Sequence, residues 1–345
     1  MKKITFCLAL LFLKVLTSVA QEGKVLNLTF HAVSIEGNLL EDSADLSVGV
    51  YLPPDYDEQS EKSYPVLYWL HGYSGRGKRT GNAGWNEKRV KGINNLITSG
   101  DIQPMIIVMP DGTNKFGGSM YTNSMVTGNW EDFIVHELRN YIDENYRTIS
   151  KAESRGIAGH SMGGYGAIKI AMKHPTIFST VYGTSSAFMA LMPNRYPQQH
   201  IDNALSMKNW EEFSNAGFYT RVILGVAAAF SPNPDNPPFY GTFPFNSSGT
   251  SSPEIEIAKA KWAANTPSWM ADQYISSLQQ LRGIAFDSGT KEMSITNENK
   301  FFSETLKRMN IKHSYEIFEG GHNDKVLERI NTKILPFFSK LLERN

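Results

Sequence analysis

The stretch GIAGHSMGGYGA (residues 156–167) decides the fold, because it places Ser161 between Gly159 and Gly163. The pattern Gly-x-Ser-x-Gly is typical of a nucleophile elbow, where a strand turns sharply into a helix and exposes a serine. A glycine-rich segment can also be only a turn. The remaining sequence must therefore supply what a reactive serine needs: a base, an acid and a site for an oxyanion.

The surrounding segments predict an α/β fold with a mostly parallel central sheet and helices on both faces. Residues 64–72 (YPVLYWLHG) and 103–112 (QPMIIVMPDG) are short and almost wholly apolar. Such continuous apolar strands are typical of sheets covered on both faces. Further strands are expected in residues 25–35, 45–52, 154–160, 281–289 and 313–320, and helices in residues 129–146, 161–174, 298–310 and 323–335. Asn129 is the expected N-cap of the helix over 129–146, and Pro336 should end or kink the last helix.

An insertion is expected over about residues 185–280, within a single domain over 21–345. Residues 231–245 contain five prolines and are followed by a Ser/Gly-rich stretch, so they cannot form a regular core element. Helix-like pieces flank them, for example residues 209–218 and 255–274. We expect the insertion to pack as a cap over the carboxyl edge of the sheet.

The N-terminus predicts a cleaved signal peptide over residues 1–20, and hence a periplasmic or extracellular protein. Lys2 and Lys3 precede an apolar run, and small Ser18 and Ala20 follow it. The run is too short for a membrane-spanning helix, so no stable membrane insertion is expected after cleavage. The only cysteine, Cys7, lies in this segment, so the mature chain has no disulfide, no Cys nucleophile and no Cys-based metal site.

The composition excludes some partners. Lys plus Arg and Asp plus Glu number 34 each, so no field of one sign indicates a nucleic acid as partner. The sequence has no Gly-rich phosphate-binding pattern of the kind that nucleotide-binding proteins use. No cofactor and no metal are implied, and the oligomeric state is left open.

The order of elements selects His322 as the candidate base. In enzymes with a nucleophile elbow, the base lies in a loop before the last helix. His322, in FEGGHND, follows a predicted strand and precedes the last predicted helix of this chain. His160 directly precedes Ser161 and is expected to point away from it. His71, at a strand end, is expected to brace a loop.

The acid and the oxyanion donors are less sharply defined by local pattern. Asp287 and Glu292 both follow a late strand, about 30 residues before His322, and the pattern alone does not choose between them. Met162, the residue after the serine, should offer one backbone N–H group to an oxyanion. A second N–H should come from Tyr73 or Gly72, in the loop after an early strand.

Taken together, these blocks resemble the esterase D-like family of α/β-hydrolases, which includes feruloyl and acetyl xylan esterases, S-formylglutathione hydrolases and the antigen 85 mycolyltransferases. The similar blocks are VYLPPDY, YPVLYWLHG, MPDG, GHSMGGYGA, FDSGTKE and GGH, in that order. The resemblance implies an α/β-hydrolase fold with Ser161 as nucleophile and His322 as base. The family's acid usually stands three residues after a strand-end glycine, here Gly289, which implies Glu292 in place of the usual Asp.

The resemblance implies a secreted serine carboxylesterase that acts on small-molecule or polysaccharide esters, with acyl or feruloyl esters of carbohydrates as the expected class. The alternatives are an acyltransferase with a sugar acceptor and a non-catalytic carbohydrate-binding protein of the same fold. Aromatic residues that could line an ester pocket, or only pack the cap, are Trp85, Tyr121, Trp130, Phe239, Tyr240, Phe243 and Phe245.

Overall fold

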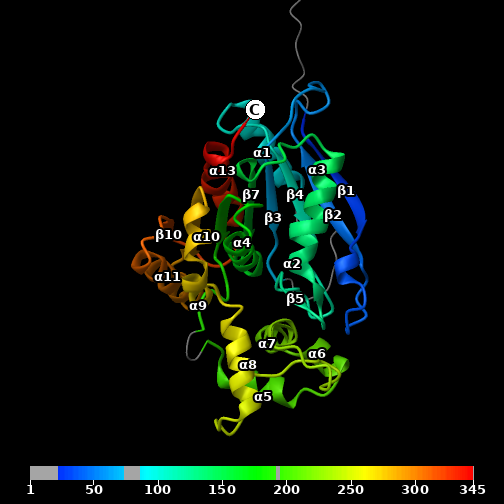
Figure 1. Ribbon diagram of the computed structural model, residues 1–345, viewed down its shortest axis with the longest axis vertical. Helices are drawn as coiled ribbons and strands as arrows, with labels where there is room; N and C mark the ends of the chain where they lie inside the picture. Colours follow the sequence, from blue (N-terminus) through cyan, green and yellow to red (C-terminus); the bar gives the residue numbers. More distant parts are fainter. Residues whose placement is uncertain (1–21, 74–85, 192–194, 345) are drawn as a thin grey trace, which may run out of the picture.

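The computed structural model describes residues 22–73, 86–191 and 195–344, and the statements below concern these residues (Figure 1). The predicted signal peptide over residues 1–20 and the candidate pocket residue Trp85 lie outside them. Within the described ranges, every helix is too short or too polar to cross a bilayer.

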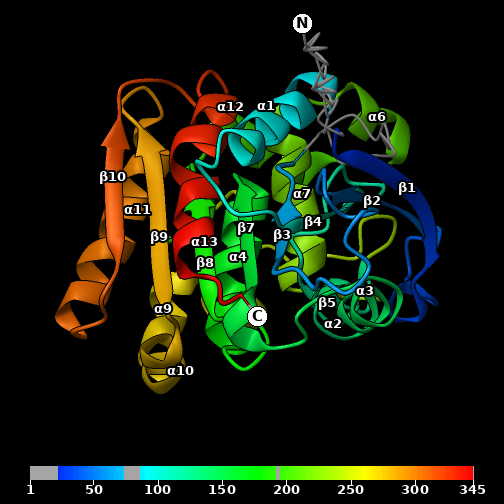
Figure 2. The same ribbon diagram turned by 90° about the horizontal axis from the view of Figure 1, so that it is seen from above.

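An eight-stranded sheet forms the centre of the molecule, in the order β1-β2-β4-β3-β7-β8-β9-β10 (Figure 2). The strands are β1 (Lys24–His31), β2 (Asp45–Leu52), β3 (Val66–Leu70), β4 (Ile106–Pro110), β7 (Arg155–His160), β8 (Thr180–Thr184), β9 (Gly283–Gly289) and β10 (Ser314–Phe318). Neighbours from β4 to β10 pair in parallel, and only β2 runs opposite to the rest. The carboxyl ends of the parallel strands therefore meet at one edge.

Two layers of helices cover the sheet. The core helices are α1 (Glu87–Thr98), α2 (Trp130–Asp132), α3 (Arg139–Asn145), α4 (Met162–Lys173), α9 (Pro267–Met270), α10 (Ile275–Gln280), α11 (Met293–Arg308), α12 (Val326–Arg329) and α13 (Leu335–Leu341). One buried apolar cluster joins the sheet to α1 and α13, and a larger one joins its other face to α2–α4 and α11. Each central strand is consequently buried on both faces, which explains why β3 and β4 read as continuous apolar runs.

Two helix ends differ in part from the expected pattern. The side chain of Asn129 makes no capping hydrogen bond; instead, Asn123 in the short strand β5 (Asn123–Ser124) accepts hydrogen bonds from the backbone N–H groups of Glu131 and Asp132. The sequence could not indicate this cap, because it comes from a neighbouring strand. Pro336 does not end the last helix, but the expected interruption is present just before it: a π-helical segment (Ile330–Ile334) separates α12 from α13. Pro336 then lies in the first turn of α13, where its missing N–H has little cost.

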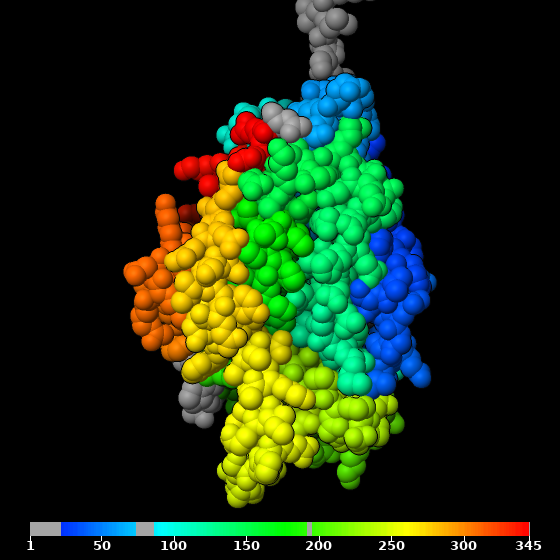
Figure 3. All heavy atoms as spheres, viewed as in Figure 1, coloured from blue at the N-terminus to red at the C-terminus, as the bar shows by residue number. Residues whose placement is uncertain are grey.

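The segment after β8 forms a cap at the carboxyl edge of the sheet (Figures 1 and 3). It contains α5 (Gln198–Ser206), α6 (Trp210–Asn215), α7 (Phe218–Phe230) and α8 (Pro253–Ala263). Helices α9 and α10 lie within the expected insertion in sequence, but they pack against α4 and α11 of the core. The cap is thus shorter than the predicted range, and it ends near Asn265.

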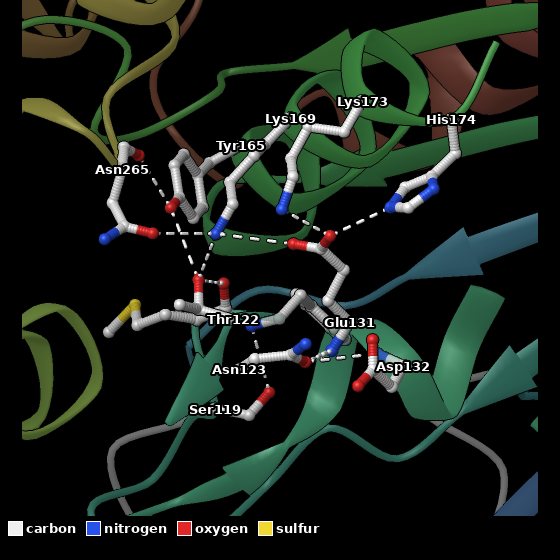
Figure 4. Close-up of polar contacts among 12 residues, drawn as sticks. Ser119, Thr122, Asn123, Glu131, Asp132, Tyr165, Lys169, Lys173, His174 and Asn265 are labelled. Carbon is white, nitrogen blue, oxygen red and sulfur yellow. Dashed lines mark hydrogen bonds and ion pairs between the residues drawn. The ribbon is translucent and has the colours of Figure 1, made fainter. Parts of the chain in front are cut away.

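A buried polar cluster connects the end of the cap to the core (Figure 4). Lys169 of α4 donates hydrogen bonds to Thr122 Oγ1 (2.6 Å) and Asn265 Oδ1 (3.0 Å), and its Nζ lies 3.8 Å from a carboxylate oxygen of Glu131. The hydroxyl of Tyr165, one turn earlier, donates to the backbone oxygen of Asn265 (2.8 Å). Burial lowers the pKa of Lys169 to about 7, although the carboxylate of Glu131 acts in the opposite direction. Helix α4, which begins directly after Ser161, therefore also anchors the cap.

Candidate active site

Ser161 occupies a sharp turn between β7 and α4. Its backbone has φ 57° and ψ −116°, a left-handed conformation that non-glycine residues rarely adopt. The turn requires glycine at Gly163, where a Cβ atom would collide with the backbone oxygen of Leu70 in β3. The unusual backbone angles of Ser161 make the turn sharp, and Gly163 lets the turn pack closely against β3. Together they place the serine at the carboxyl edge of the sheet.

The structure brings Ser161, His322 and Glu292 together from three distant parts of the sequence. The Nε2 atom of His322 lies 3.0 Å from Ser161 Oγ, and its Nδ1 atom lies 2.6 Å from Glu292 Oε2. An ionised carboxylate only accepts hydrogen bonds, so Nδ1 donates to Glu292 and Nε2 is left to accept from the serine hydroxyl. This is the tautomer that a general base next to a serine needs.

Glu292 is held on both of its carboxylate oxygens. Its side chain is buried, and Oε1 accepts hydrogen bonds from Ser185 Oγ (2.6 Å) and from the backbone N–H of Gly289. The backbone of Glu292 bonds back to Gly289 as well, in the turn between β9 and α11. The carboxylate is therefore fixed against His322 before any ligand binds.

Asp287, the alternative acid, lies in a separate buried cluster. Its carboxylate pairs with Arg329 (2.7 Å and 2.9 Å) and accepts hydrogen bonds from Tyr182 and Thr184 of β8. Successive residues of a strand point to opposite faces, and Asp287 lies inside β9, whereas Glu292 follows the end of β9. The structure thus places Glu292, and not Asp287, against His322.

The three candidate oxyanion residues all lie close to Ser161. Met162 is the first residue of α4, where backbone N–H groups have no partner within the helix. A Cβ atom on Gly72 would lie 3.2 Å from the Cβ of Ser161, so the loop after β3 passes directly beside the serine. The next residue in this loop is Tyr73, whose hydroxyl donates to the backbone oxygen of Phe116.

His71 fixes the orientation of this loop. Its Nε2 atom accepts a hydrogen bond from the backbone N–H of Gly112 (2.8 Å), so its Nδ1 atom donates to the backbone oxygen of Gly72 (2.7 Å). In a trans peptide, the C=O and the following N–H point in opposite directions. The backbone N–H of Tyr73 therefore points away from the His71 ring. The prediction that His71 braces a loop, made from its position at a strand end, is therefore confirmed.

Two residues at the site were not identified from the sequence. Ser185 follows β8, a strand that we did not predict. His160 was expected to point away from the serine, yet its Nε2 atom donates to the backbone oxygen of His322 (2.7 Å), and the two imidazole rings lie 4.7 Å apart. Burial, together with the neighbouring His322, lowers the pKa of His160 to about 4, so this ring is neutral at pH 7. His160 follows the alternation of β7, but the His322 loop comes from more than 150 residues away, and no local signal indicates the contact.

The candidate pocket aromatics divide into two groups. Tyr121 and Trp130 are fully buried in the core, and Phe239 packs against Trp210 within the cap. Phe239 and Phe243 line one cavity in the cap, Phe245 lines a second, and Tyr240 packs against the apolar core cluster. Within the described ranges, no group of three or more His, Cys, Asp or Glu side chains is placed as metal ligands would be.

Comparison with known families identifies the chain. A family model described as putative esterase matches residues 43–328. The chain belongs to this esterase family. The resemblance noted from the sequence blocks is therefore confirmed, and the matched residues begin just before β2 and end within α12.

Curated relatives match only a part of the chain. Esterase Rv1288 of Mycobacterium tuberculosis is 41% identical over 132 residues, which are 37% of this chain and 26% of that protein. An endo-1,4-beta-xylanase/feruloyl esterase of Xylanibacter ruminicola is 33% identical over 139 residues, 38% of this chain and 18% of that protein. The matched region thus spans about a quarter or less of these longer proteins.

Solved structures agree with the predicted fold. The structure of a ferulic acid esterase has a TM-score of 0.64 at 22% identity, covering 94% of this chain and 100% of that one. Mycobacterium tuberculosis MPT51 has a TM-score of 0.57 at 14% identity, with 93% and 99% covered. At these identities the likeness shows the fold alone, and it confirms the α/β-hydrolase architecture.

Proposed function

We propose that the protein is a serine carboxylesterase with a catalytic triad of Ser161, His322 and Glu292. The observation that carries the proposal is the chain of two hydrogen bonds, 3.0 Å and 2.6 Å long, from Ser161 Oγ through His322 to Glu292. A serine hydroxyl is a poor nucleophile until a base accepts its proton, and the carboxylate holds that base in the right tautomer and stabilises it when charged. Membership of the esterase family supports ester hydrolysis as the reaction.

In the proposed mechanism, Ser161 Oγ attacks the ester carbonyl while His322 Nε2 takes its proton. The backbone N–H groups of Met162 and Tyr73 donate hydrogen bonds to the oxyanion that forms, and Gly72 allows the loop to approach because it has no Cβ. His322 then returns the proton to the departing alcohol oxygen, which leaves an acyl group on Ser161. Water, deprotonated by His322, attacks this acyl-enzyme and releases the acid.

For the substrate class, we propose acyl or feruloyl esters of carbohydrates. The named feruloyl esterase activity of one relative and the feruloyl esterase fold of a solved structure support this class. The basic start and the apolar run of residues 1–20 support export of the protein from the cytoplasm, and polysaccharide esters are found outside it. The same acyl-enzyme could pass its acyl group to a sugar hydroxyl, and product analysis separates the two reactions.

A panel of acetyl, butyryl and feruloyl esters tests the proposal with the wild type and with Ser161→Ala. We expect the wild type to hydrolyse esters and the variant to lose nearly all turnover with an unchanged unfolding midpoint. A variant that retained wild-type turnover would contradict the assignment of Ser161. Chromatography of the products, with and without an added sugar acceptor, distinguishes free acid from a new sugar ester.

A further inference from the structure

The first turn of α7 exposes two aromatic side chains on a helix that is otherwise buried. Phe218 and Tyr219 are 48% and 47% exposed, whereas nearly all residues from Thr220 to Phe230 are buried. Single exposed apolar side chains are common on protein surfaces, whereas adjacent exposed aromatic groups more often mark a binding surface. The exposed position of Phe218 and Tyr219 therefore needs an explanation.

These two rings connect the candidate oxyanion loop to the outer part of the cap. The ring of Phe218 lies 5.7 Å from that of Tyr73, and the ring of Tyr219 lies 5.4 Å from that of Phe218. Tyr219 in turn lies 6.2 Å from Tyr196, in the segment before α5. Tyr73, Phe218, Tyr219 and Tyr196 thus form a continuous aromatic row that starts in the loop after β3, where the preceding residue Gly72 lies beside Ser161.

The aromatic row leads to a cavity of about 670 Å³, a volume typical of sites for small organic ligands. Apolar and aromatic surfaces of Tyr196, Phe245 and Trp262 line it, together with the polar groups of Arg195, Gln198 and Lys259. This mixture of flat apolar faces and hydrogen-bonding groups matches a pyranose ring, which has apolar C–H faces and a rim of hydroxyl groups.

The cations of the cavity already have carboxylate partners. Arg195 pairs with the buried Glu298 and lies over the ring of Phe188 at 4.5 Å, and Lys259 pairs with Glu256 at 2.7 Å. The cavity therefore offers hydrogen-bond donors without an excess of positive charge. Such donors suit hydroxyl groups better than a free phosphate or carboxylate, which would need unpaired cations.

We propose that the aromatic row and the cavity bind the oligosaccharide part of the ester substrate, which extends from the ester bond at Ser161 into the cap. The proposal rests on the proposed esterase function and adds the side from which the sugar chain is recognised. Sugar rings would stack on Phe218 and Tyr219, and the far end of the chain would enter the cavity at Tyr196. An ester of a small alcohol reaches Ser161 but leaves these surfaces empty.

A pair of substrates with the same acyl group tests the proposal: methyl ferulate and a feruloylated oligosaccharide of several sugar units. For the wild type, we expect a higher kcat/KM with the oligosaccharide ester. In Tyr219→Ala, the ratio of the two kcat/KM values should fall by about fivefold, mainly through KM, since one aromatic contact contributes about 1 kcal/mol. Tyr219→Phe keeps the ring and should retain the ratio.

Trp269→Ala is the matched control, because Trp269 is also an exposed aromatic residue but packs against Phe301 and does not line the cavity. It should leave both the ratio and the two rates at wild-type values. An unchanged ratio in Tyr219→Ala, or an equal fall in Tyr219→Phe, would overturn the proposal. So would a wild type that hydrolyses methyl ferulate but not the oligosaccharide ester. A wild type that hydrolyses neither of these substrates, nor the acetyl and butyryl esters of the panel, would instead contradict the proposed esterase function.

Discussion

Replacing Glu292 and Asp287 one at a time should separate a catalytic carboxylate from a structural one. In Glu292→Gln, the amide can place its oxygen or its NH₂ group toward His322. With NH₂ there, His322 must present an acceptor on Nδ1 and carries its proton on Nε2, so it cannot accept the proton of Ser161. With oxygen there, the NH₂ group faces the N–H of Gly289, which is also a donor. The first orientation therefore removes the tautomer that the base needs, and the second leaves two donors facing each other.

The expected magnitudes differ for the two variants. Loss of the correct His tautomer reduces kcat by about 10³- to 10⁴-fold, or about 4–5.5 kcal/mol of transition-state stabilisation. Asp287→Asn should leave turnover of the folded protein nearly unchanged. It should instead lower the free energy of unfolding by about 1–3 kcal/mol, because the buried Arg329 loses one of its two carboxylate partners and keeps only Glu316.

Hydrolysis of a p-nitrophenyl ester and unfolding in urea measure both effects on the same samples. Glu292→Gln should fail in the first assay and remain close to the wild type in the second, whereas Asp287→Asn should show the reverse. If folded Asp287→Asn lost turnover while Glu292→Gln retained it, the assignment of Glu292 as the acid would be refuted.

Three further perturbations follow from the structure. His160→Leu should lower kcat by about tenfold without a large change in KM, because the His322 loop loses the hydrogen bond from Nε2 and the contact between the two rings. Steady-state kinetics above pH 6 measures this effect, and an unchanged kcat would argue against a positioning role. Burial tends to raise the pKa of Glu131, but the hydrogen bond from His174 and the charges of Lys169 and Lys173 lower it to about 2 from 4.5. The ionised Glu131 therefore adds about 3 kcal/mol to the free energy of unfolding above pH 4.5, and this contribution is lost as the pH falls through 2. Urea midpoints of the wild type and Glu131→Gln should therefore converge between pH 5 and pH 2, and a constant difference would contradict this. Gly163→Ala should not give soluble folded protein, since its methyl group meets the Leu70 backbone oxygen; a normal circular dichroism spectrum and yield would be inconsistent with the turn described.

Much of the sheet and two members of the candidate triad could be predicted because their signals are local. The apolar runs of β3 and β4, the glycines around Ser161, and the place of His322 before the last helix can each be read from a short window. A short stretch of sequence was not enough to choose Glu292 over Asp287, and the choice came from the family resemblance. In the structure, that choice depends on where β9 ends, which shifts the carboxylate to the edge of the sheet.

The elements that were not predicted have physical reasons. β8 (TVYGT) is short and contains a glycine, so its strand signal is weak. α7 is apolar on all sides and has no polar face to give a helical period, because the cap and the core enclose it. His160 and Ser185 contribute through contacts with residues more than 100 positions away, and a single sequence does not contain that information.

Covalent labelling with a fluorophosphonate tests the central claim most directly, because it requires an activated serine but no knowledge of the natural substrate. We expect one equivalent of label per chain, located by peptide mass mapping on the segment that contains Ser161. Ser161→Ala should take up no label, and His322→Ala should react far more slowly, since the hydroxyl then lacks its base. Equal labelling of Ser161→Ala, or label on a different residue, would contradict the account.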